Sequence, residues 1–145
     1  MGNGARGAYT ASQVSAGRKN GLSMEIYGSK CGVAWNQERP DELWIGNRNS
    51  NNQILIKDPS LMKPAARSYA DLPGGHSEGY DDTFKQVFRR FYHSIEDPSA
   101  QPEYPQFVDG LRQLTILEAE LQSSQKRAWV DVPALDAANK DAPSA

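Results

Sequence analysis

The feature that most constrains the fold is a change in the spacing of apolar residues at Pro59. Before Pro59, apolar side chains recur at every second position, which places them on one face of a β-strand. After it, they recur every three to four residues, as on one side of a helix. Strands followed by helices, rather than alternating with them, are typical of an α+β layer. The sequence therefore predicts a mostly antiparallel sheet that is covered on one face by two main helices.

The predicted strands share alternating side chains and are separated by turn-forming residues. In chain order they are Tyr9–Ser15, Leu22–Ile26, Cys31–Trp35, Leu43–Ile45 and Ile54–Ile56. A turn at Gly28–Lys30 makes the second and third strands a hairpin, and the Asn-rich segment Gly46–Asn52 joins the last two. The small side chains of Tyr9–Ser15 would let another layer pack closely over that strand.

The first predicted helix carries an apolar stripe whose members are Phe84, Val87, Phe88, Phe91 and Ile95. Ser77 is its expected N-cap, Asp81 and Asp82 suit the positive end of the helix dipole, and Asp97-Pro98 ends it. The stripe of the second helix consists of Phe107, Leu111, Leu114, Leu117 and Leu121. Trp129–Val132 is expected to form a short final strand or edge segment. Domain bounds of 4–132 follow, with residues 133–145 as a disordered tail.

Composition narrows the class of protein. A chain of 145 residues suits a single hydrophobic core, and a net charge of −2 offers no general attraction to nucleic acid or acidic membranes. No apolar run is long enough to cross a bilayer. The single cysteine, Cys31, excludes a disulfide framework or a cysteine zinc cluster, and no secretory signal is visible. We therefore expect a soluble protein of the reducing cytoplasm that binds no nucleic acid, no membrane and no metal.

Three glycine-rich or basic segments are the candidates for ligand binding. Gly2–Gly7 matches the G-x-G-x-x-G spacing of dinucleotide sites, but it lacks the preceding strand and following helix that such a site needs, so a frayed terminus or a turn is the better interpretation. Gly17–Gly21 holds two cations and an amide, which suit either a ligand or an ordinary solvated turn. Leu72–Tyr80 places His76 in a glycine-rich loop ahead of a helix, where it either exchanges protons with a ligand or faces water.

Other polar groups do not assemble into a catalytic set. His93 lies off the stripe of its helix and is expected in solvent. Asp81 and Asp82 are neighbours that point in different directions, and no G-x-S-x-G elbow is present. No catalytic residue is therefore assigned, and the three tryptophans are expected to serve packing.

Several strings, in order and spacing, resemble the C-terminal domain of Gfo/Idh/MocA oxidoreductases, in particular their sugar dehydrogenase-like members. The strings are Gln13–Asn20, Glu25–Lys30, Leu43–Gly46, Leu72–Tyr80, Phe107–Leu111 and Trp129–Val132. The resemblance implies an enzyme in which a Rossmann domain binds NAD or NADP and a sheet domain follows. One side of that sheet helps to form the substrate cleft, and its open face packs against another subunit. The implied reaction is hydride transfer between the nicotinamide and a sugar or cyclitol carbon that bears a hydroxyl.

The resemblance also implies which residues contact substrate and which parts are missing. It places Arg18, Lys19, Asn20 and His76 at the cleft as substrate contacts. The glycine-rich βα turn, the Glu-Lys-Pro motif with its catalytic lysine, and the Asp and His of the family's next helix have no counterpart here. The leading hypothesis is therefore a substrate and oligomerisation domain that is inactive alone, works with a Rossmann domain and binds no cofactor itself. A stand-alone self-association module and a small enzyme built around His76 remain open alternatives.

Overall fold

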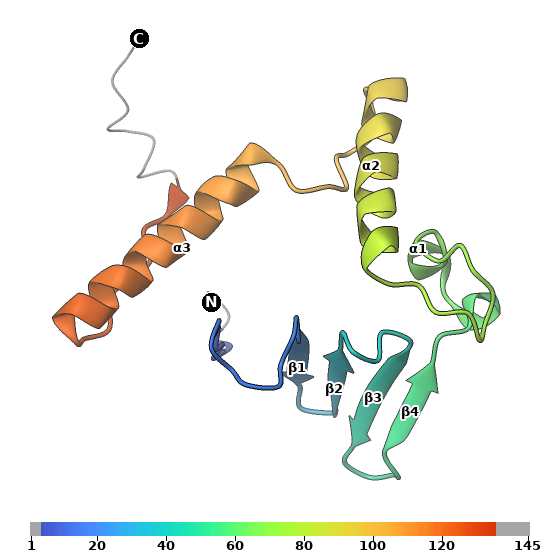
Figure 1. Ribbon diagram of the computed structural model, residues 1–145, viewed down its shortest axis with the longest axis horizontal. Helices are drawn as coiled ribbons and strands as arrows, with labels where there is room; N and C mark the ends of the chain where they lie inside the picture. Colours follow the sequence, from blue (N-terminus) through green and yellow to red (C-terminus); the bar gives the residue numbers. More distant parts are fainter. Residues whose placement is uncertain (1–3, 136–145) are drawn as a thin grey trace. The chain divides into compact units, whose positions relative to one another are not determined.

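The structure is a computed structural model that describes residues 4–135 and divides the chain into two compact units, Met1–Asp82 and Thr83–Ala145 (Figure 1). Four antiparallel strands in the order β1-β2-β3-β4 form the sheet of the first unit. Their bounds are β1 Ser23–Tyr27, β2 Cys31–Asn36, β3 Glu42–Asn47 and β4 Gln53–Ile56. The predicted α+β class is thereby confirmed. The covering of one sheet face by helices stays a prediction, as do the domain bounds 4–132.

The hairpin turns form where glycine and asparagine predict them. The Gly28 N–H donates to the Cys31 carbonyl at 2.9 Å, which closes the β1–β2 turn. In the β3–β4 connection, the Asn47 N–H donates to the Asn52 side chain at 3.0 Å, and the Asn47 amide donates to the Asn51 carbonyl. These short-range bonds fix the register of each strand pair and so decide which side chains share a face.

The register gives the sheet two faces of different character, because directly opposite residues lie on the same face. We call one the Met24 face; it carries Met24, Ile26, Cys31, Val33, Trp35, Leu43, Ile45, Asn47, Gln53 and Leu55. We call the other the Trp44 face; it carries Ser23, Glu25, Tyr27, Gly32, Ala34, Asn36, Glu42, Trp44, Gly46, Ile54 and Ile56. The Met24 face is mainly apolar, with Asn47 and Gln53 as polar members, whereas the Trp44 face combines aromatic, small, polar and charged residues.

Two glycines on the Trp44 face make room for aromatic rings. Gly32 and Gly46 are paired across β2 and β3. A Cβ on Gly32 would lie 2.7 Å from the Tyr27 ring, and a Cβ on Gly46 would overlap the Trp44 ring. The rings therefore lie over the glycine backbone and flatten this face. The Tyr27 hydroxyl donates to the Glu25 carboxylate at 2.6 Å, which keeps a hydrogen-bonded polar pair on it.

Two predicted strands are absent from the described structure. Tyr9–Ser15 and Trp129–Val132 have no regular secondary structure, and Val14 and Trp129 are exposed. A strand persists only where its backbone groups pair with a neighbour, and the Ser, Thr and Ala side chains of Tyr9–Ser15 supply little apolar area to hold it against one. Alternation alone therefore predicted these two strands wrongly.

Three helices and one 3-10 turn follow the sheet: η1 Pro59–Leu61, α1 Pro64–Arg67, α2 Tyr80–Glu96 and α3 Phe107–Lys126. The two long helices match the predicted stripes, and α2 ends just before Asp97-Pro98. The prediction of Ser77 as the N-cap is wrong, because α2 begins at Tyr80. Instead the Asp82 carboxylate accepts the Gly79 N–H at 2.8 Å, so a carboxylate inside the first turn satisfies a free donor there.

The connection between α2 and α3 packs back on the end of α2. The Ser94 hydroxyl lies 3.1 Å from the Tyr104 hydroxyl, the Phe91 and Tyr104 rings meet edge to face at 5.5 Å, and Arg90 pairs with Glu103 at 3.0 Å. Arg127 takes a left-handed conformation and ends α3. The predicted tail lies outside the described residues from position 136 onward.

The chain leaves much of its apolar surface uncovered. Ala70 and Ala119 are the buried hydrophobic residues among those described, and large side chains on both sheet faces and along α2 and α3 are exposed. Large apolar side chains of the kind that proteins usually bury are therefore exposed in both units.

Candidate functional site

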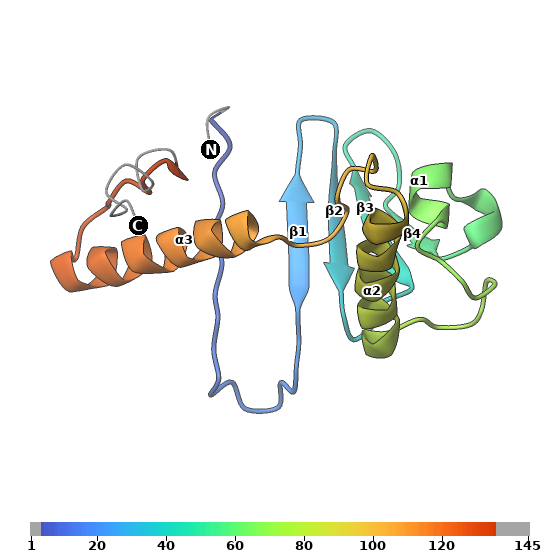
Figure 2. The ribbon, with the colours of Figure 1, turned by 90° about the horizontal axis from the view of Figure 1, so that it is seen from above.

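The two segments of the first unit that carry the predicted substrate contacts lie at one end of the sheet. In an antiparallel meander, the start of β1, the β2–β3 turn and the end of β4 all lie at the same end. The segment before β1 holds Gly17–Gly21, and the chain after β4 leads into the His76 loop, which we define as Leu72–Gly79. Figure 2 shows the turn before β1 at this end and the β1–β2 turn at the opposite end. We call this region the polar end of the sheet.

The predicted basic segment is a turn that leads into β1. The Arg18 N–H donates to the Ser15 carbonyl at 3.2 Å, and Gly17 has a φ of 81°, which favours glycine. The Arg18 guanidinium lies 3.4 Å from the Glu38 carboxylate in the β2–β3 turn. Arg18, Lys19 and Asn20 are all exposed. Their side chains are therefore accessible to a ligand at the β1 edge of the polar end.

His76 lies at a tight turn in its loop. The His76 N–H donates to the Pro73 carbonyl at 3.2 Å, and Gly75 has a φ of 81°, the geometry of a type II turn with glycine at its third position. A Cβ on Gly74 would lie 3.5 Å from the Asp58 carboxyl carbon, so the turn packs against the chain that follows β4. The His76 side chain is exposed, which leaves its ring accessible at the β4 edge of the polar end.

Glycine conformation gives the first testable prediction. Gly75→Ala should destabilise the first unit by about 1 to 2 kcal/mol, because a Cβ is strained at a positive φ. Gly74→Ala is the matched control and should have little effect, since its Cβ would make ordinary contacts. Urea denaturation followed by the signals of the sheet measures both. Equal effects of the two substitutions would contradict the turn geometry.

Arg18 and His76 share one end of the sheet but lie at its opposite edges. Neighbouring strands are about 4.8 Å apart, so β1 and β4 are separated by about 14 Å. A ligand that touched both segments would therefore extend across the β2–β3 turn. That turn is fixed by the Trp35 indole N–H, which donates to the Pro40 carbonyl at 3.0 Å.

A partly buried ion pair beneath the His76 loop was missed by the sequence analysis. The Lys57 ammonium lies 2.6 Å from one Glu78 oxygen and 3.8 Å from the Asp41 carboxylate. The other Glu78 oxygen accepts the Asp71 N–H at 2.8 Å. The Lys57 and Glu78 side chains are only 12% and 10% exposed. No motif marks this pair, because its partners are separated by the whole η1–α1 segment.

The environment of Glu78 sets its ionisation. Burial has the largest single effect and would raise the pKa, but the hydrogen bonds from Lys57 and from the Asp71 and Leu72 backbone, together with the Lys57 charge, lower the pKa below its ordinary value of 4.5. The carboxylate is therefore ionised at neutral pH. Asp58 nearby also has a lowered pKa, because the Ser60 hydroxyl and N–H donate to it.

Acid should weaken the first unit through Glu78. Because its folded pKa is lowered, the stabilisation from Glu78 is present above pH 4.5 and is lost as the pH falls through the folded pKa. We expect the difference in urea midpoint between the native chain and Glu78→Gln to be largest near neutral pH and to shrink below pH 4.5. A difference that stays constant across that range would show that Glu78 gains nothing from its charge.

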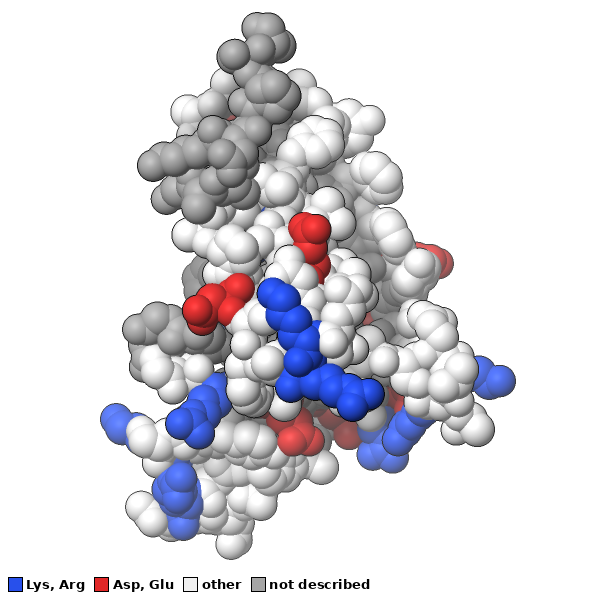
Figure 3. Space-filling view, turned by 90° about the vertical axis from the view of Figure 1, so that its left-hand side faces the viewer, with Lys and Arg blue, Asp and Glu red and all other residues white. Residues whose placement is uncertain are grey.

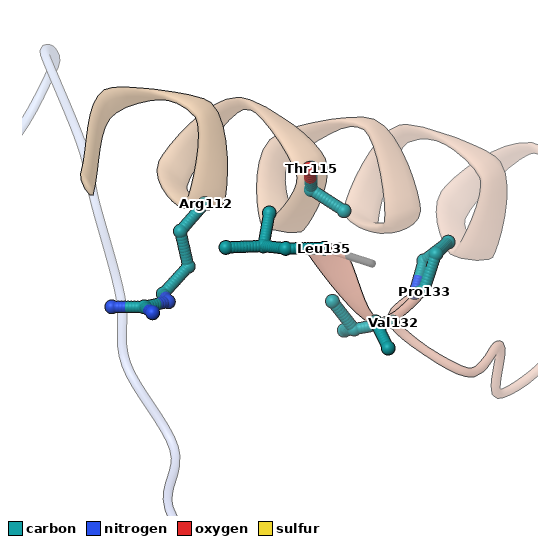
Figure 4. A pocket seen from close by; sticks show the side chains of 6 residues that line it. Arg112, Thr115, Val132, Pro133 and Leu135 are labelled. Atoms are coloured by element: carbon teal, nitrogen blue, oxygen red, sulfur yellow. The ribbon is translucent and has the colours of Figure 1, made fainter. Parts of the chain in front are cut away.

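A hollow lies in the other unit, between α3 and the segment after it. Its volume is about 360 Å³, and it is lined by Arg112, Thr115, Val132, Pro133, Ala134 and Leu135 (Figure 4). Arg112 lies 3.4 Å from Asp109, one turn earlier on α3, so its charge is already offset. The hollow is open, and its wall combines polar and apolar groups. Its lining gives no cluster of groups for catalysis.

The described part of the N-terminal glycine motif does not have the surroundings of a dinucleotide phosphate site. Gly4 has a φ of 78°, but residues 4–22 contain no helix whose N-terminus could face a pyrophosphate. Within residues 4–135, no group of three His, Cys, Asp or Glu side chains could hold a metal ion. None of the helices found over that range is both long and apolar enough to cross a bilayer. Figure 3 shows basic and acidic side chains interspersed on one face of the molecule.

Comparisons with known proteins point to one enzyme class. No protein-family model matches the chain. Levoglucosan dehydrogenase of Pseudarthrobacter phenanthrenivorans is 28% identical over 138 residues, which cover 93% of this chain and 35% of that enzyme. The crystal structure of an oxidoreductase from Sinorhizobium meliloti is 33% identical with a TM-score of 0.76, over 83% of this chain and 35% of that one.

A levoglucosan dehydrogenase structure in complex with NADH and L-sorbose is 26% identical with a TM-score of 0.70, over 83% of this chain and 32% of that one. The chain thus spans about a third of the length of the relatives that it matches. In sequence and in fold, it is similar to part of several oxidoreductases.

Proposed function

We propose that the chain is the substrate-binding and oligomerisation domain of an NAD(P)-dependent oxidoreductase that acts on a sugar or cyclitol hydroxyl. The observation that carries this proposal is the similarity to levoglucosan dehydrogenase over 93% of the chain. The solved relative with NADH and L-sorbose supports the same cofactor and substrate class. The Gfo/Idh/MocA family, and a place at the C-terminal end of the parent enzyme, are part of the proposal. A cytoplasmic location is part of it too.

The polar end of the sheet supplies the groups that would bind substrate. Arg18, Lys19 and Asn20 donate hydrogen bonds at the β1 edge, and the His76 ring donates or accepts one at the β4 edge. Sugars and cyclitols carry hydroxyls along their whole ring. Several separated hydrogen-bonding groups can therefore bind such a ligand at different hydroxyls. The four side chains are exposed, so they are available for these hydrogen bonds.

The cofactor would be held elsewhere in the parent enzyme. Because residues 4–22 do not fit a pyrophosphate site, NAD or NADP is assigned to a Rossmann domain that packs against this chain. The catalytic lysine is assigned to the same part. The chain by itself should orient the substrate without oxidising it.

The open sheet supports an assembly role. The Trp44 face is flat and combines Tyr27, Trp44, Ile54 and Ile56 with a hydrogen-bonded polar pair, a composition that suits subunit interfaces better than a domain core. The Met24 face is mainly apolar and suits cover by helices of the same chain. We assign the Trp44 face to contact with a second copy.

Titration of the purified chain tests this function. We expect myo-inositol at millimolar concentration to shift the NMR signals of the His76 loop and of Gly17–Gly21, and NADH to cause no saturable change. Saturable NADH binding by this chain would contradict the assignment of the cofactor to another domain. Sugar-induced shifts confined to the α3 hollow would contradict the assignment of the substrate contacts.

A self-association module without catalysis is the second candidate, and the uncovered sheet faces favour it. Both functions predict self-association, so the sugar titration separates them. A chain that forms oligomers but gives no response to any sugar or cyclitol would favour the module.

A further inference from the structure

We propose that Glu78 and Lys57 act as positioning residues, which together close the His76 loop on the end of β4 and so hold His76 at the substrate site. This inference rests on the proposed function for the role of His76. The closure of the loop itself stands on the hydrogen bonds and burial described above. We call the Lys57–Glu78 pair, with the two backbone donors that it holds, the loop clamp.

The Glu78 carboxylate connects three parts of the chain. One oxygen contacts Lys57, the residue that directly follows β4. The other accepts the N–H of Asp71, just before the loop, and the N–H of Leu72, where the loop begins, also donates to the carboxylate. Glu78 itself lies two residues before α2. A single carboxylate therefore joins the sheet, the start of the loop and the approach to the helix.

The loop needs such a closure because its own sequence does not order it. Gly74, Gly75 and Gly79 leave the backbone free to adopt many conformations, and fixing each residue costs conformational entropy. Within residues 72–77, all of which the structure describes, the Pro73–His76 turn holds the backbone, and Gly74 lies close to Asp58. The clamp brings the two ends of the segment together, and the turn then presents His76 outward.

Lys57 is held at its place independently of the loop. Its backbone N–H donates to the Asp41 carbonyl at 2.8 Å, and its ammonium also lies near the Asp41 carboxylate. The anchor of the loop is therefore part of the β3–β4 ladder, so the position of His76 is fixed relative to the strands.

The test compares Glu78→Gln with Glu42→Gln by amide exchange and by myo-inositol titration of the full chain. Glu42 is a matched control, because its carboxylate lies 3.6 Å from Arg39 at the same end of the sheet but is more exposed. In Glu78→Gln we expect exchange of the Gly74–His76 amides to rise and the affinity for myo-inositol to fall by about tenfold or more, with the β1–β3 signals unchanged. Glu42→Gln should change neither.

Each outcome has a distinct meaning. If loop exchange rises in Glu78→Gln although the native chain binds no myo-inositol, the clamp stands and the proposed function fails. If myo-inositol binds the native chain but Glu78→Gln leaves loop exchange and affinity unchanged, the clamp is overturned and the proposed function stands. If Glu78→Gln loses the sheet signals as well, the same two measurements on Lys57→Arg decide between the clamp and a general loss of folding. Lys57→Arg keeps the charge and should retain loop protection and sugar affinity, whereas equal disturbance of the loop and of β1–β3 would overturn the clamp.

Discussion

Replacing Lys57 with Met is expected to lower the free energy of unfolding of the first unit by about 2 to 3 kcal/mol, because it leaves the partly buried Glu78 carboxylate without its counterion. Both side chains are shielded from water, so solvent does not replace the lost partner. Arg39→Met is the matched control. Its pair with Glu42 is exposed, so the loss should stay below about 1 kcal/mol.

The double variant Lys57→Met/Glu78→Met separates the two origins of this effect. Removing both charges should recover part of the stability lost in Lys57→Met, since no unpaired carboxylate remains. The Asp71 and Leu72 N–H groups would still lose their acceptor, so recovery should be incomplete. Urea denaturation of the native chain, Lys57→Met, Glu78→Met and the double variant at pH 7 gives the comparison. Additive losses in the double variant would show that the pair is not coupled.

Lysine substitutions on the two sheet faces should have different consequences. Ile54→Lys/Ile56→Lys on the Trp44 face should weaken self-association by tenfold or more, because each isoleucine that an interface buries contributes about 1.5 to 3 kcal/mol. Met24→Lys/Leu55→Lys on the Met24 face should instead lower the stability of the chain, since we assign that face to cover by its own helices. All four side chains are more than half exposed in the structure.

Sedimentation equilibrium and urea denaturation distinguish the two variants. The assignment holds if the first variant is a stable monomer and the second is destabilised. It is contradicted if the Met24-face variant alone dissociates, which would exchange the roles of the two faces.

The sequence predicted those parts of the fold that short-range interactions determine. The strands near Met24, Trp35, Trp44 and Leu55 formed as expected because alternation, glycine turns and the Asn-rich connection agree there. The helix stripes were also correct. Tyr9–Ser15 and Trp129–Val132 were wrong because a strand depends on a neighbour, and alternation in one segment does not specify one.

The candidate site was also predicted only where short-range interactions determine it. Glycines at 17 and 75 indicated turns, and both have a positive φ in the structure. The loop clamp depends on Lys57 and Glu78, which are far apart in sequence and belong to no motif. Their pairing is set by the path of the chain through η1 and α1, neither of which has an apolar stripe. The roles of Arg18, Lys19, Asn20 and His76 in binding substrate stay predictions.

The most direct test of the central claim replaces the matching third of Pseudarthrobacter phenanthrenivorans levoglucosan dehydrogenase with this chain. The chimera should reduce NAD⁺ in the presence of a sugar or cyclitol, and His76→Ala should lower kcat/KM by about tenfold, the effect of one lost hydrogen bond to substrate. A folded chimera that binds NADH but oxidises no member of a sugar and cyclitol panel would contradict the account. Activity that is unchanged in His76→Ala would contradict the role of the His76 loop.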